Sequence, residues 1–98
     1  MEDKYKGCLV CSKAGHDRGE VFLVTGEEGN TVFLADGRGR GADTPKRKNI
    51  KHLALIRRGY PPELRDRVRR GELPDDDEIR RVIKDYKRFC SNQEEVNV

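Results

Sequence analysis

The segment that decides the fold is residues 7–24, GCLVCSKAGHDRGEVFLV. Two runs rich in valine, leucine and phenylalanine, which favour β-structure, flank a polar turn. The glycines of the turn supply backbone freedom, and Asp17 can accept hydrogen bonds from neighbouring amides. The pattern predicts a strand, a tight loop and a second strand, with Lys13, His16 and Arg18 projecting from the loop.

More strands are expected up to about residue 58, because short apolar runs alternate there with glycine and polar turns. The second and third strands are apolar on both faces, which suits a small, strongly curved sheet whose outer face is partly covered. Closure removes exposed edges and favours a small barrel over a flat sheet. The expected strands are Gly7 to Cys11, Glu20 to Thr25, Thr31 to Ala35 and Asn49 to Ile56, with a hairpin loop over residues 26–30 and a short strand or irregular ribbon around Arg38 to Arg40.

After Gly59 the apolar pattern takes a helical period. Pro61 and Pro62 are expected to start a short helix, and Gly71 is placed to end it. A mainly β fold is therefore expected, with a small barrel over residues 1–58 and a helical C-terminal extension of one or two helices over residues 59–98.

A second helix is predicted from Asp75, which forms a capping box with Glu78 three residues later. The apolar residues of this helix lie within one arc and the basic ones lie opposite. A helix of this length is marginal alone, so it should dock on the barrel or on a partner. Residues 91–98 are expected to be a frayed tail.

The composition limits the class of protein. The chain has 98 residues, of which 40% are charged and 34% hydrophobic, as expected of one small domain with a modest core. No apolar run exceeds four residues, and no apolar segment follows Met1, so neither a membrane span nor an export signal is expected. Three cysteines, an odd number, favour reduced thiols and a cytoplasmic location.

The formal net charge of +3 hides an uneven distribution. Residues 36–58 hold eight basic and two acidic residues, a local net charge of +6, whereas residues 1–35 sum to −2 and residues 59–98 to −1. A basic block of this kind suits a polyanion-binding surface, because each cation brought to a phosphate releases counterions. The alternative is a solvated loop with surplus lysines.

The strand–loop–strand segment over residues 7–24 resembles the KOW motif of SH3-like barrels in translation proteins and transcription elongation factors. Residues 35–38 (ADGR) and 44–53 (TPKRKNIKHL) make the chain most similar to small bacterial KOW proteins that are related to archaeal and eukaryotic large-subunit ribosomal proteins. The resemblance covers about half of the chain. It implies an RNA-binding SH3-like barrel that works on or near the ribosome.

Candidate RNA-binding residues follow from the resemblance and from the basic block. The KOW loop implicates Lys13, His16 and Arg18. The later segment implicates Arg38, Lys46, Arg47, Lys48 and Lys51. Arg40 belongs to a short RGG-like element, residues 37–41, which is either a grip on single-stranded RNA or a flexible turn whose arginines reach phosphate.

Other polar residues have competing interpretations. Cys8-x-x-Cys11 lacks the second ligand pair of a structural zinc site, so structural thiols are favoured over metal, and Cys90 is interpreted in the same way. His52 is either a structural histidine or a contact that stacks on RNA. His16 has no nucleophile in a recognisable arrangement, so hydrolysis is not expected.

The sequence supports two main hypotheses of function. The first is a non-enzymatic, cofactor-free and metal-free RNA-binding protein, monomeric when free, that grips structured RNA such as ribosomal RNA through its backbone. The second is a protein-interaction module that docks a ribosomal or transcription partner through the barrel or the amphipathic helix. A zinc site formed by the cysteines is a third, weaker hypothesis.

Overall fold

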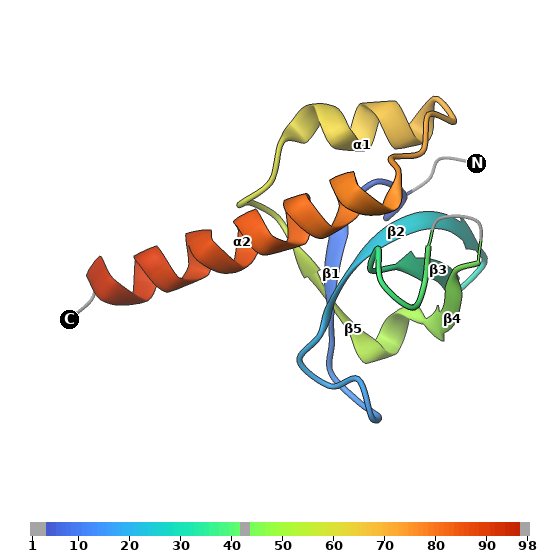
Figure 1. Ribbon diagram of the computed structural model, residues 1–98. Coiled ribbons are helices and arrows are strands. Elements are labelled where there is room, and N and C mark those ends of the chain that lie inside the picture. Colours follow the sequence, from blue (N-terminus) through green and yellow to red (C-terminus); the bar gives the residue numbers. More distant parts are fainter. Residues whose placement is uncertain (1–3, 42–43, 97–98) are drawn as a thin grey trace.

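Five antiparallel strands form one sheet in the order β4-β3-β2-β1-β5 (Figure 1). The computed structural model describes residues 4–41 and 44–96. The strands are β1 (Leu9–Ser12), β2 (Val21–Glu28), β3 (Thr31–Ala35), β4 (Lys46–Asn49) and β5 (Leu53–Ile56), and a short 3-10 helix, η1 (Ile50–His52), joins the last two. Two helices follow, α1 (Pro62–Arg69) and α2 (Asp76–Val96). The predicted mainly β fold with a helical C-terminal extension is confirmed.

Both faces of the curved, barrel-like sheet are buried, as the double-sided apolar pattern predicted. Because side chains alternate along a strand, Val10, Phe22 and Val24 enter one core on one face of the sheet. Leu9 and Leu23 point to the other face and join a second core with the helices. The N-terminal strands therefore serve two cores at once.

The helices cover the second face of the sheet (Figure 1). Leu64 and Val68 of α1 and Ile79 and Ile83 of α2 are all buried in the same core as Leu9. Of the two docking surfaces predicted for the second helix, the structure uses the barrel. The change in apolar periodicity at Gly59 marks the change from strands to helices. One core contains residues from both sides of Gly59.

Two glycines bring α2 close to the sheet. Gly37 has φ +78°, and a Cβ there would lie 2.5 Å from the carbonyl oxygen of Asp76. Gly59 has φ +99°, and its Cβ would lie 2.7 Å from the ring of Tyr86. Any larger residue at either position would be strained in its backbone and would push the helix away.

Several predicted strand bounds are wrong. Residues 49–56 are not one strand: η1 interrupts them, because the Asn49 side chain accepts a hydrogen bond from the Lys51 amide and caps the turn. The segment before it, where no strand was expected, is strand β4, which pairs with β3. Of the two alternatives for residues 38–40, a short strand or an irregular ribbon, the structure has an irregular bend. β2 continues past a register shift between Val24 and Gly26 and ends at Glu28. Because the strand is longer than expected, the hairpin loop is shorter.

The helices follow the predicted starts with two differences. The Glu78 amide donates to Asp75 Oδ1 at 2.8 Å, so the N-cap forms. The Glu78 carboxylate does not complete the capping box, because it accepts from Arg67 Nη1 at 2.5 Å and Nη2 at 3.0 Å and ties α2 to α1. The helix also continues to Val96, beyond the expected start of the frayed tail. Neither helix in the described part of the chain has the length and apolar character of a membrane span.

Candidate nucleic-acid interface

Asp17 is the centre of an ion-pair cluster that fixes the β1–β2 loop, residues 13–20. Its side chain is only 8% exposed and accepts hydrogen bonds from Lys46 Nζ and Lys48 Nζ, each at 2.5 Å, and from Ser12 Oγ at 2.7 Å. Lys48 Nζ also donates to the Ala14 carbonyl at 2.9 Å. The cluster thus joins the loop to β4, which lies about 30 residues later in the chain. We call Ser12, Asp17, Lys46 and Lys48 the Asp17 cluster.

The cluster keeps Asp17 ionised. Burial alone would raise the pKa of this carboxyl, but hydrogen bonds from Lys46, Lys48 and Ser12 outweigh the burial and hold the pKa well below its usual range. A buried carboxylate with several charge-assisted hydrogen bonds is a strong local anchor. The sequence led us to expect that Asp17 would bond neighbouring amides, whereas it binds two distant lysines.

Two of the predicted RNA-binding residues, Lys46 and Lys48, have an ion-pair partner inside the protein. The ammonium groups of Lys46 and Lys48 point to Asp17, and only 36% and 13% of their side chains are exposed. Part of their charge is already neutralised inside the protein. They therefore hold the loop in position, and they leave less positive charge for a phosphate than the sequence indicated.

The β1–β2 loop sorts its charges by direction. Asp17 points inward, while Lys13, His16 and Arg18 are exposed, as predicted; Glu20, at the end of the loop, is exposed as well. The Lys13 amide donates to the carbonyl of His52 at 2.8 Å, which fixes the start of the loop against η1. The loop therefore presents its basic side chains to solvent and hides its aspartate.

Arg47 and Lys51 are exposed on the neighbouring elements, β4 and η1. The guanidinium carbon of Arg47 lies 5.7 Å from the centre of the Phe33 ring, within cation–π range. His52 is half-buried, which leaves both of its predicted roles open.

The loop between β3 and β4 holds Arg38 and Arg40. Asp36 Oδ1 accepts hydrogen bonds from the amides of Arg38 at 2.9 Å and Arg40 at 3.1 Å, which forms a tight turn with both arginine side chains exposed. Arg80 of α2 donates to the Gly37 carbonyl and pins the turn to the helix. The RGG-like element is thus a hydrogen-bonded turn at the described residues.

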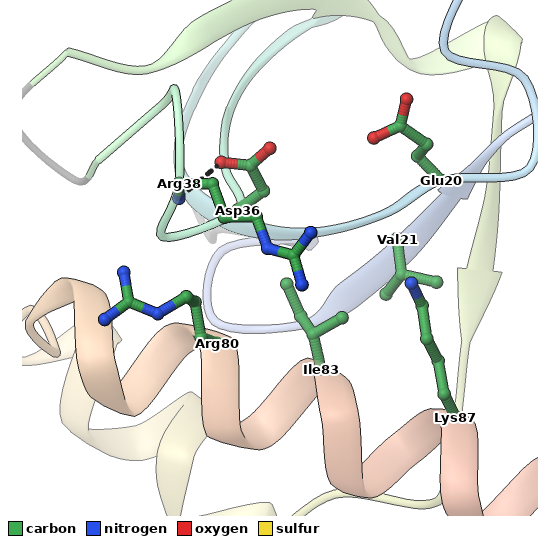
Figure 2. Close-up of a pocket in the computed structure, with 7 residues that line it drawn as sticks. All are labelled: Glu20, Val21, Asp36, Arg38, Arg80, Ile83 and Lys87. Carbon is green, nitrogen blue, oxygen red and sulfur yellow. Dashed lines mark hydrogen bonds between the residues drawn. The ribbon is translucent and has the colours of Figure 1, made fainter.

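A small pocket of about 60 Å³ lies where this turn, the start of β2 and α2 meet (Figure 2). We call it the seam pocket. The sheet side contributes Glu20 and Val21, the turn contributes Asp36 and Arg38, and the helix contributes Arg80, Ile83 and Lys87.

Arg80 and Lys87 of α2 line the seam pocket, and the sequence interpretation did not include them among the candidate RNA-binding residues. The signal was present in the sequence, because Arg80 and Lys87 lie beside Ile83 at the edge of the apolar arc of the helix. What the sequence did not supply was the position of the helix, which brings these two residues to Arg38.

The three cysteines are free thiols, with Cys8 buried and Cys11 and Cys90 half-buried. Burial, together with the contact with the Cys8 thiol, raises the pKa of Tyr60 to about 12. Within residues 4–41 and 44–96, no group of three or more His, Cys, Asp or Glu side chains is placed to hold a metal ion.

Comparison with known proteins adds no family assignment. The sequence matches no protein-family model, and no curated protein is significantly similar to it. The similarity to KOW proteins therefore rests on the motif residues themselves.

Proposed function

We propose that this protein is a non-enzymatic RNA-binding module of the KOW type that grips the sugar–phosphate backbone of structured RNA, with ribosomal RNA in the cytoplasm as its target. The observation that carries the proposal is the sorting of charge in the β1–β2 loop. Asp17 is buried and paired, so no exposed acidic side chain of the described loop lies between Lys13, His16 and Arg18, and the exposed Glu20 lies at the end of the loop beside β2. A rigid loop with outward cations suits phosphate contacts, which position a protein on RNA without reading its sequence.

Arg47 on β4 and Lys51 on η1 are two further exposed cations on the neighbouring elements. A-form RNA is recognised mainly by shape and backbone, for which such a surface is sufficient.

A protein-interaction module that docks through an apolar patch has less support. The apolar arc of α2 is used inside the molecule, where Ile79 and Ile83 are buried and Val82 and Tyr86 pack against the same core. Among the described residues, the exposed large hydrophobic side chain is Leu73, at 46%. An isolated leucine does not form the contiguous patch that docking needs.

The test is the salt dependence of binding to a fluorescent ribosomal RNA hairpin, measured by anisotropy with the full chain. Arg18→Gln is expected to weaken binding about fivefold and to reduce the slope of log K against log salt concentration by about one. Arg70→Gln is the matched control, because Arg70 is exposed at the end of α1, far from the β1–β2 loop (Figure 1), and should leave both quantities unchanged. Binding with no salt dependence, or equal effects of the two substitutions, would refute phosphate contacts by the loop.

A further inference from the structure

We propose that the seam pocket binds one phosphate group of the RNA backbone between Arg38 and Lys87, so that α2 is part of the RNA interface. The proposal rests on the RNA-binding function above and names a second point of contact, separate from the β1–β2 loop. Arg38 lies in the β3–β4 turn and Lys87 on α2, so only the folded chain brings them together.

The cations at the pocket differ in whether they have partners. Arg80 is engaged, because its guanidinium binds Asp77 and the Gly37 carbonyl. No ion pair within the described part of the chain involves the Arg38 guanidinium or the Lys87 ammonium. In Figure 2 the Arg38 side chain extends from the turn toward Ile83 of α2, and the Lys87 side chain extends from α2 toward Val21 at the start of β2. Like charges held near one another repel, and an anion between them removes that cost.

The two carboxylates at the pocket leave this space open. Asp36 Oδ1 is occupied by the amides of Arg38 and Arg40. In Figure 2 the carboxylates of Asp36 and Glu20 both point away from α2. The side of the pocket that faces the helix is therefore the positive side.

Size and polarity favour a phosphate over a larger ligand. A cavity of about 60 Å³ has room for roughly four water molecules, whereas pockets for drug-sized molecules start at about 300 Å³. The apolar side chains of Val21 and Ile83 line one wall. Such a wall excludes water and strengthens the attraction between a phosphate and the flanking cations.

The site is also held in place before RNA binds. The bond from Arg80 to the Gly37 carbonyl fixes the turn on α2, and the buried Ile83 anchors the helix on the sheet. Arg38 and Lys87 thus start from fixed backbone positions, which lowers the entropy lost on binding.

The test compares two lysines of the same helix in the anisotropy assay, with the full chain. Lys84 and Lys87 are both exposed on α2, but only Lys87 lines the seam pocket. Lys87→Gln is expected to weaken RNA binding about fivefold and to lower the salt slope by about one, while Lys84→Gln stays within twofold of wild type. Equal effects of the two substitutions, or none, would overturn the seam site and leave the function of the β1–β2 loop intact. A wild-type chain that does not bind RNA would overturn both.

A double-mutant cycle with Arg38→Gln tests whether the two cations share one phosphate. Sharing predicts that the double variant loses less affinity than the product of the two single losses, whereas independent contacts multiply. A product within experimental error would overturn the shared site. The thermal midpoint of each variant should match wild type, which separates lost contact from lost folding.

NMR of the Ile83 methyl groups separates RNA from free phosphate as the ligand. RNA is expected to shift these signals at concentrations where inorganic phosphate does not. Saturation by inorganic phosphate alone, with no response to RNA, would assign the pocket to a small anion and overturn the proposal.

Discussion

Replacement of Asp17 by asparagine tests the Asp17 cluster, because the amide keeps the shape of the carboxylate and removes its charge. The Lys48 side chain is only 13% exposed, so its ammonium would lose its counterion in a mostly buried place. Breaking a buried pair by removing one partner costs about 3–5 kcal/mol. Lys46 is 36% exposed and can return to water, which places the expected loss near the lower limit, about 3 kcal/mol. The thermal midpoint should fall by about 12–24 °C in a domain of this size.

The assay is urea unfolding of wild type and Asp17→Asn at pH 7 and pH 3, followed by circular dichroism. The folded-state pKa of Asp17 is depressed, so its stabilisation is complete above the unfolded-state pKa of about 3.9 and is lost as the pH falls toward the folded-state pKa. Each pH unit below about 3.9 removes about 1.4 kcal/mol from the difference in unfolding free energy between wild type and Asp17→Asn. The difference in unfolding free energy should therefore shrink from about 3 kcal/mol at pH 7 to about 2 kcal/mol at pH 3.

Asp85→Asn is the matched control, because the Asp85 side chain is 58% exposed and forms a long ion pair, with 4.0 Å between its Oδ1 and Arg88 Nη1. It should change stability by less than about 0.5 kcal/mol at either pH. The reasoning fails if Asp17→Asn is as stable as this control. It also fails if the difference from wild type is the same at pH 7 and pH 3.

Three other perturbations have defined outcomes. Gly37→Ala should destabilise the fold by about 2 kcal/mol or more, because the added Cβ would meet the Asp76 carbonyl. Gly71 also has a positive φ but faces open space, so Gly71→Ala should cost about 1 kcal/mol. Equal losses of stability in thermal unfolding would contradict the close approach of α2 to Gly37. Arg67→Gln should raise the pKa of Glu78 toward its ordinary value, because hydrogen bonds from Arg67 now lower it, and an unchanged NMR titration would refute the tie between the helices. EDTA should leave the thermal midpoint unchanged; a lower midpoint would revive the zinc hypothesis.

The elements that could be predicted are those whose side chains carry the pattern. β2 and β3 are apolar on both faces, and α2 has an apolar arc and an N-cap, so local sequence and final burial agree. β4 could not be predicted, because its sequence, KRKN, has no apolar alternation. It is a strand because β3 supplies the pairing, with Val32 opposite Lys48 and Leu34 opposite Lys46. Tertiary pairing overrides local propensity at such positions.

The site shows a similar division. That Lys13, His16 and Arg18 are exposed follows from a polar turn between two strands, and the sequence was sufficient to predict it. The partners of Asp17 were not predictable, since they lie 29 and 31 residues away and reach the loop only after the sheet has curved. The place of α2 beside the β3–β4 turn depends in the same way on packing, through glycines whose role is visible only in three dimensions.

Charge along a chain and charge on a surface are therefore different quantities in this protein. The +6 block of residues 36–58 loses part of its effect because Lys46 and Lys48 face Asp17, an acidic residue from the segment that sums to −2. The segment that sums to −1 contributes Lys87 to the same neighbourhood as Arg38. Under the proposed function, an RNA backbone would meet cations from all three segments, so substitutions should be chosen by the direction in which a side chain points. By that criterion Arg18 and Lys87 are better tests of RNA binding than the central lysines of the basic block.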